Sequence, residues 1–176
     1  WIIVRALAFN LSNSSYRNIR FGFKIDYRGS YVTYIKSLCI TLISVGLGTP
    51  YAAYLHSCFR LNRIRFGREY FQFHADSERF FSVFIKALLF YAFGIAIFVA
   101  VILLKAKAIV AIGFVTLYLG MIAAGAWIHA GVANLNANGS GLKDVRFHST
   151  LSGWTFVQIY LTNFLACVFT LGLAIP

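Results

Sequence analysis

Residues 43–51 read ISVGLGTPY and interrupt a long apolar stretch with two glycines and a proline. A similar pattern, FTLGLAIP, returns in residues 169–176. Glycine is unfavourable inside a helix, and proline removes a backbone donor and clashes with the preceding helical turn. The two stretches therefore predict helix breaks at Gly46, Gly48, Pro50, Gly172 and Pro176.

The composition indicates that these breaks belong to a membrane protein. The chain is 60% hydrophobic and 12% charged, whereas soluble domains average about 25% charged residues. Residues 87–104, 108–135 and 154–176 contain no Asp, Glu, Lys or Arg. Roughly 20 apolar residues cross a bilayer, so all three are candidate spans, and residues 37–55 are a fourth. A soluble protein of this length could not cover so many apolar helices with polar residues.

Residues 37–55 could adopt either of two conformations. They could cross the membrane as one kinked helix. Alternatively, a helix over about residues 30–46 could reverse at residues 46–49 into a second helix beginning at Pro50, which suits a first helical turn. Four full crossings leave seven basic residues on each side, whereas reversal places twelve on one side and two on the other. The positive-inside tendency favours reversal, with the kinked crossing as the alternative.

Short strands are predicted in the polar segments between the apolar stretches. Residues 19–25, IRFGFKI, are apolar at every second position, which is typical of a half-buried strand. Shorter alternations occur in residues 71–73 and 145–147. Each is followed by a few polar or glycine residues and then by an apolar segment.

The chain also resembles itself. A shift of 126 residues places Arg20 on Arg146 without a gap, and a shift of 74 places Asn62 on Asn136. The shared unit is a helix end, a tight turn, a short strand and a new helix. These matches predict one membrane domain over residues 1–176, part of a longer chain, with repeat units at approximately residues 10–60, 61–135 and 136–176.

Small side chains at helical spacing predict close helix packing. Ala92, Ala96 and Ala100 form one such row, and Gly120 with Ala124 forms another.

The chain has no pattern that indicates catalysis. All five acidic residues lie outside the charge-free stretches, so the spans lack the carboxylates typical of proton pumps. His56 and Cys58 offer two metal ligands, fewer than a zinc site needs. We predict no catalytic, cofactor-binding or metal-binding residues, and no enzyme activity. The candidate polar contacts inside the membrane are His129, Gln158, Thr162 and Asn163.

Basic residues predict contact with an anionic surface. The net charge is +11, and the basic residues crowd at the ends of apolar segments, as in cytoplasmic loops of membrane proteins. This distribution favours lipid headgroups over nucleic acid. The strongest cluster is Arg60, Arg63, Arg65 and Arg68. A helix starting at Pro50 would present several of these arginines as one interfacial stripe, for headgroups or an acidic partner.

Three segments resemble the YjgN family of bacterial inner-membrane proteins: SYRNIRFGF at residues 15–23, RLNRIRFGREYFQF at 60–73, and STLSGWTFVQIYLTNFLACVFTLGLAIP at 149–176. The chain departs from the family pattern at Val45, where Leu is usual, and at Tyr51, where Trp is common. The resemblance implies a multipass membrane protein of unassigned activity. It also implies, through gene neighbourhood, a partnership with a membrane-associated zinc protease.

We therefore predict an all-α membrane protein of the bacterial inner membrane, a multipass bundle with Gly/Pro-broken helices, cytoplasmic strands and an internal repeat. The favoured function is a non-enzymatic scaffold that binds lipid headgroups or another membrane protein. The alternative is a transporter or channel module with a midplane site at the broken helices. That alternative requires Gln158, Thr162, Asn163 and the carbonyls near Gly46 and Gly172 to converge on a cavity.

Overall fold

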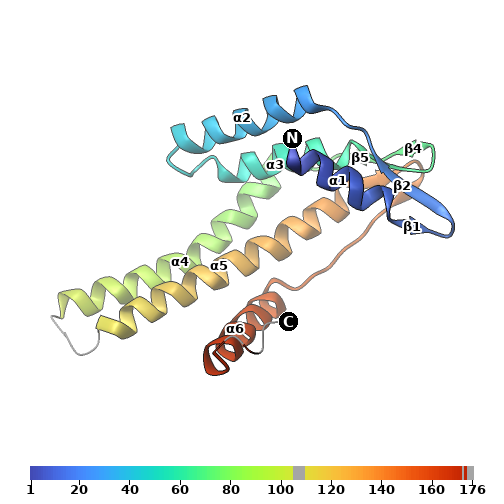
Figure 1. The fold of residues 1–176 in the computed structure, drawn as a ribbon. Coiled ribbons are helices and arrows are strands. Elements are labelled where there is room, and N and C mark those ends of the chain that lie inside the picture. The colour runs from blue at the N-terminus through green and yellow to red at the C-terminus, as the bar shows by residue number, and fades with distance from the viewer. Residues whose placement is uncertain (105–109, 172, 174–176) are drawn as a thin grey trace. The chain divides into compact units, whose positions relative to one another are not determined.

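The computed structural model describes residues 1–104, 110–171 and 173 (Figure 1). The described residues are mostly helical, with short strands between the helices, as the sequence predicts. The chain divides into two compact units, Trp1–Phe81 with Asn134–Ser149 and Ser82–Ala133 with Thr150–Pro176. Gly172 and Pro176, two of the predicted helix breaks, lie outside the described residues.

The first unit alternates helices with β-hairpins. Its elements in chain order are α1 (Ile2–Ser12), β1 (Ser15–Tyr16), β2 (Ile19–Phe23), α2 (Tyr27–Ile43), α3 (Thr49–Leu61), β3 (Ile64–Phe66), β4 (Glu69–Tyr70), β5 (Gln72–Phe73), the start of α4 (Ser77–Leu103), the end of α5 (Val110–Asn138), β6 (Ser140–Leu142) and β7 (Val145–Arg146). The strands form two sheets, β1-β2-β3-β4 and β5-β6-β7.

The three hairpins share one register. Ser15 pairs with Arg20, Arg65 with Tyr70, and Gly141 with Arg146, so the hairpins are offset by 50 residues (15 to 65) and 76 residues (65 to 141). The turns obey the same offsets, because the residue two positions after each of these first partners has a positive φ: Arg17 at 49°, Gly67 at 61° and Lys143 at 54°. Positive φ is what tight two-residue hairpin turns require.

The offset of 76 corrects the shift of 74 predicted from the sequence. The shift of 74 matches residue types, but it misaligns the paired strands by two positions. The total offset of 126 between the first and third hairpins agrees with the sequence comparison.

Successive hairpins pair with each other in the same way. β2 pairs with β3 through Gly22 and Arg65, and β5 pairs with β6 through Gln72 and Gly141. One backbone hydrogen bond extends each pairing: Lys24 N donates to Arg63 O at 2.9 Å, and His74 N donates to Gly139 O at 2.8 Å. We call these the first junction (β2 with β3) and the second junction (β5 with β6).

The helices that leave the hairpins also begin at equivalent positions. α2 begins at residue 27, α4 at residue 77 and α6 (Gly153–Phe169) at residue 153, which repeats the offsets of 50 and 76. Asp26 caps α2 by accepting a hydrogen bond from Gly29 N at 2.8 Å, and Ser152 caps α6 by accepting one from Thr155 N. A side-chain oxygen at this position satisfies a backbone N–H that the first helical turn leaves free.

The second unit contains the apolar parts of α4 and α5 together with α6. α4 and α5 are long and apolar enough to cross a membrane by length and composition, whereas α6 is shorter, with 17 residues. A small core joins Ala123, Ala126 and Val157 with partly buried aromatic neighbours. Large apolar side chains elsewhere on α4 are exposed, among them Leu89 at 68% and Phe93 at 69%.

The close contact between α4 and α5 uses glycine. A Cβ added to Gly120 would lie 2.9 Å from the carbonyl oxygen of Phe90 and 3.6 Å from Cα of Gly94. The predicted contribution of Gly120 to close packing is therefore present. The predicted row of Ala92, Ala96 and Ala100 is instead exposed, because Gly94 faces α5 on this helix.

Candidate functional site

The break after α2 is a short turn held by its own polar groups. α2 ends at Ile43, three residues before the predicted position, and α3 begins at Thr49, one residue before Pro50. Ser44 Oγ donates to Ile40 O at 2.6 Å and accepts from Gly48 N at 2.6 Å. Gly46 has a φ of +90°, a conformation that glycine adopts without strain.

The chain reverses at this turn and does not continue as one kinked helix. Ser37 Oγ of α2 and His56 Nε2 of α3 lie 2.7 Å apart, although 19 residues separate them. The ring of Tyr34 also packs against His56, with centroids 4.5 Å apart. Gly46, Gly48 and Pro50 therefore belong to a helical hairpin, with Pro50 in the first turn of α3.

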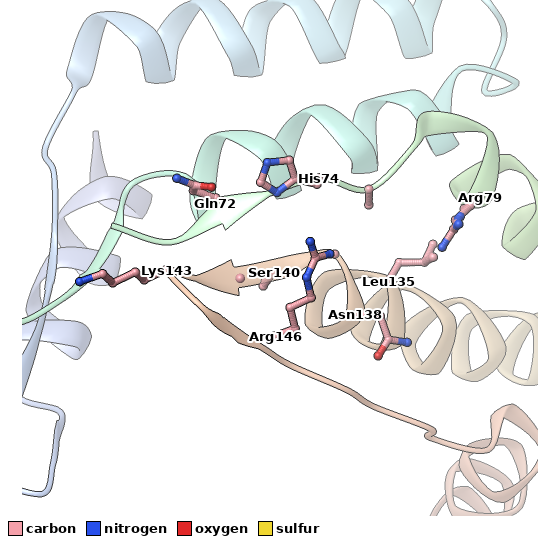
Figure 2. A pocket seen from close by; sticks show the side chains of 11 residues that line it. Gln72, His74, Arg79, Leu135, Asn138, Ser140, Lys143 and Arg146 are labelled. Atoms are coloured by element: carbon pink, nitrogen blue, oxygen red, sulfur yellow. The ribbon is translucent and has the colours of Figure 1, made fainter. Parts of the chain in front are cut away.

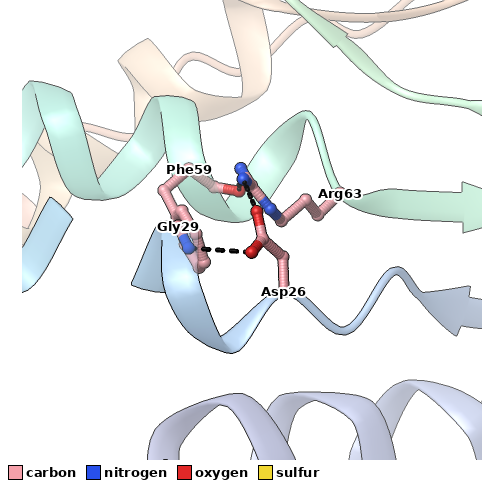
Figure 3. Close-up of polar contacts among 4 residues, drawn as sticks. All are labelled: Asp26, Gly29, Phe59 and Arg63. Atoms are coloured by element: carbon pink, nitrogen blue, oxygen red, sulfur yellow. Dashed lines mark hydrogen bonds and ion pairs between the residues drawn. The ribbon is translucent and has the colours of Figure 1, made fainter. Parts of the chain in front are cut away.

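An ion pair fills the space beside the first junction (Figure 3). Arg63 Nη2 lies 2.5 Å from Asp26 Oδ2, and Arg63 Nη1 donates to the carbonyl of Phe59 at 3.2 Å. The guanidinium also lies over the Phe59 ring, 3.9 Å from its centroid. The hydrogen bond from Arg63, followed by the amide of Gly29, holds the pKa of Asp26 below its ordinary value.

The predicted arginine stripe does not form. α3 ends at Leu61, so of the four arginines only Arg60 is helical, while Arg65 lies in β3 and Arg68 in the hairpin turn. The sequence prediction was wrong because a spacing of three to four residues persisted beyond the helix end. Arg60, Arg65 and Arg68 are exposed, and Arg63 is committed to Asp26.

A polar cavity of about 270 Å³ lies beside the second junction (Figure 2). In Figure 2, His74 and Arg146 flank it from β5 and β7, and Arg79 approaches it from α4. Lys143 lines it from the hairpin turn. The remaining lining residues are Gln72, Ala75, Leu135, Asn138, Gly139, Ser140 and Gly141.

The register of the two junctions explains why this space is open. Gly139 and Gly141 occupy the positions that Arg63 and Arg65 hold at the first junction, since both pairs differ by 76 residues. Gly139 cannot carry a side chain, because an added Cβ would lie 2.7 Å from Cβ of Ala75 and 2.8 Å from the carbonyl of Leu135. The second junction therefore lacks the arginine that fills the first.

The basic residues of the cavity have little internal compensation. Arg79 Nε lies 3.7 Å from Asp76 Oδ2, and both side chains are about 70% exposed (68% and 73%). Within the described ranges, neither Lys143 nor Arg146 forms an ion pair with an acidic side chain. Asp144 follows Lys143 in the chain without pairing with it. The cavity thus combines two uncompensated cations with one weakly compensated cation.

The predicted intramembrane polar residues lie at exposed positions of the second unit. Gln158, Thr162 and Asn163 are on α6, and the hydroxyl of Thr162 donates to the carbonyl of Gln158 at 2.8 Å. His129 of α5 packs near Phe156 and Tyr160 of α6, with ring centroids 5.8 and 6.3 Å away. None of the four is buried, so within the described residues they do not enclose a polar site.

The whole chain, residues 1–176, matches the model of a family described as a bacterial protein of unknown function (DUF898). The chain belongs to this family. The resemblance to YjgN-type proteins is thereby confirmed. No curated protein and no solved structure matches the chain.

Sequence reasoning missed the cavity residues His74, Arg79, Lys143 and Arg146. Each is an isolated basic or polar residue in the chain, and no local motif marks it. The usable signal was the repeat itself. With the correct offset of 76, a pair of arginines aligns with a pair of glycines, which predicts an opening at the second junction.

Proposed function

We propose that this family member is a multipass membrane scaffold of the bacterial inner membrane, without enzyme activity, which binds anionic lipid headgroups through its hairpins. The distribution of charge carries the proposal. All five acidic and thirteen of the sixteen basic residues lie in the first unit, within residues 1–81 and 134–149. In residues 82–133 and 150–176 only Lys86, Lys105 and Lys107 are charged.

A bilayer accounts for this separation. An apolar surface such as that of α4 is stable against acyl chains, where backbone groups must be satisfied within the helix. Basic hairpins are stable at the surface, where each Lys or Arg gains about 1 kcal/mol from anionic lipid. The α2–α3 reversal supports placing all three hairpins on one side, as the charge count of the sequence favours.

We also propose that the chain is an internal repeat of helix–hairpin–helix units. Equal hairpin registers, turn conformations and helix starts at offsets of 50 and 76 support a common origin of the units. The helix ends support it as well: Val45 after α2 and Leu171 after α6 both have a φ of 51°.

Membrane insertion and topology are tested together. Single cysteines replace Arg17, Gly67 or Lys143 in a variant whose native cysteines are serine, and a further one replaces Leu104. In sealed membrane vesicles, an impermeant maleimide should label the three turns from one side and residue 104 from the other. Release of the protein by alkaline carbonate, or labelling of the turns from different sides, would contradict the proposal.

Headgroup binding is tested by mass spectrometry of lipids retained by the purified protein. Phosphatidylglycerol should be enriched over phosphatidylethanolamine relative to the source membrane, and an unchanged ratio would contradict headgroup binding. The same purification tests the zinc-protease partnership, which stays a prediction. The transporter alternative also stays a prediction, since its polar residues on α6 are exposed and no described feature favours it.

A further inference from the structure

We propose that the cavity at the second junction binds one phosphate-type anion, presented either by a lipid headgroup or as free phosphate. The inference rests on the proposed function and narrows it to one site. Its residues all belong to the first unit, so the site is complete within that unit.

The first junction is the internal reference for this assignment. There, the Arg63 side chain crosses the Phe59 ring and reaches Asp26 beside Gly29. At the second junction, the offsets place Leu135 at the position of Phe59 and Gly139 at that of Arg63. Both residues line the cavity. The cavity therefore takes the place of a side chain that neutralises an acid at the first junction.

The position of Gly29 has also changed its chemistry. By the offset of 50 residues it corresponds to Arg79, whose guanidinium lines the cavity and only weakly engages Asp76. Positive charge thus enters this space from α4 instead of from the strand. Lys143 and Arg146 add two further cations on the hairpin side.

The charge and size of the cavity select the ligand class. Two cations without an acidic partner match a phosphate group, which carries up to about two negative charges near neutral pH. Arginine presents several N–H donors in a planar fork that fits phosphate oxygens, and lysine contributes a point charge. A volume of about 270 Å³ lies just below the roughly 300–1,000 Å³ typical of drug-sized ligands. It therefore suits a single headgroup or a small anion.

The test compares Arg146→Gln with Arg20→Gln in the full chain. Both residues pair with the first strand of their own hairpin at equivalent positions, and both changes remove one charge, but only Arg146 lines the cavity. Lys143→Gln provides a second cavity variant. Circular dichroism and thermal unfolding establish that each variant is folded.

Two probes distinguish the sources of the anion. Inorganic phosphate is titrated calorimetrically into protein held in phosphatidylcholine nanodiscs. Spin-labelled phosphatidylglycerol reports association with the protein in phosphatidylcholine membranes. For at least one probe, Arg146→Gln should weaken binding about tenfold, because one charge-assisted hydrogen bond is lost, while Arg20→Gln should stay within about twofold of the original protein. Lys143→Gln should weaken binding of the same probe.

The outcomes separate the site from the wider function. Equal binding by the original protein and both cavity variants, equal losses in Arg146→Gln and Arg20→Gln, or no binding of either probe would overturn the site. If phosphatidylglycerol binds but the cavity variants do not change it, headgroup binding stands and the site falls. If phosphate binds through Arg146 while phosphatidylglycerol shows no preference over phosphatidylcholine, the site stands and the headgroup function falls.

Discussion

The glycine contact between α4 and α5 predicts opposite effects for two similar substitutions on α5. Gly120 and Gly125 are both helical, but an added Cβ at Gly125 meets nothing within 4 Å, whereas at Gly120 it lies 2.9 Å from the Phe90 carbonyl oxygen. The obstacle at Gly120 is backbone of the neighbouring helix, so relief requires α4 and α5 to move apart. A flexible side chain could have turned away instead.

The magnitudes follow from this difference. Replacing a helical glycine by alanine stabilises a helix by about 0.5–1 kcal/mol, and Gly125→Ala should gain this amount. At Gly120 the same gain is opposed by overpacking, which costs about 1–3 kcal/mol. The free energy of unfolding of Gly120→Ala should therefore be lower than that of Gly125→Ala by about 1–3 kcal/mol.

The measurement is reversible unfolding of the purified protein from mixed micelles by increasing mole fractions of dodecyl sulfate, followed by circular dichroism. Both variants have the same composition, so detergent affinity cancels in the comparison. If Gly120→Ala is as stable as Gly125→Ala, then α4 and α5 do not approach closely at Gly120 and the reasoning fails.

Three further predictions concern the helix caps and the buried core. Ser152→Ala should destabilise the protein by about 0.5–2 kcal/mol in thermal unfolding, because the cap of α6 is lost, while Ser152→Asp should retain most of the stability; equal losses would contradict capping. Arg63 and then the Gly29 amide hold the pKa of Asp26 below its ordinary 3.8, so its carboxylate contributes stability that is complete above that value and is lost as the pH falls through the lower folded pKa. Acidification from about pH 5 should therefore lower the melting temperature of the original protein more than that of Asp26→Asn, and parallel profiles would refute the assignment. Phe80 is fully buried whereas Phe81 is 38% exposed, so Phe80→Ala should cost about 3–5 kcal/mol in the same dodecyl sulfate titration and Phe81→Ala clearly less; a reversed order would contradict the packing of Phe80.

Much of the local structure was predictable because each signal is local. Alternation in residues 19–25 predicts β2, and the glycines and proline of residues 46–50 predict the end of one helix and the start of another. Charge counting could choose the reversal because the two conformations distribute basic residues differently. The family resemblance extends over the whole chain and was likewise visible in the sequence.

The arginine cluster shows where such reasoning fails. Arg60 and Arg63 are spaced as neighbours on a helix, but α3 ends between them. The helix end depends on Arg63 reaching Asp26, 37 residues earlier in the chain, and on strand pairing with β2. Neither contact has a local signature. The cavity was equally hidden, because it depends on which residues of two different hairpins face each other.

The pairing between hairpins has a direction. In both junctions, the chain leaving one hairpin pairs with the first strand of the next, so the two borders of a hairpin are not interchangeable. Two borders of the same kind cannot reproduce this pairing, which rules out a twofold symmetric association through the junction geometry. Growth of such an array is therefore vectorial, like polymerisation from one end: a new unit adopts the arrangement of its predecessor while its own sequence is free to diverge. Loss of two arginines in a later unit can then turn a filled structural position into an open one without disturbing the framework.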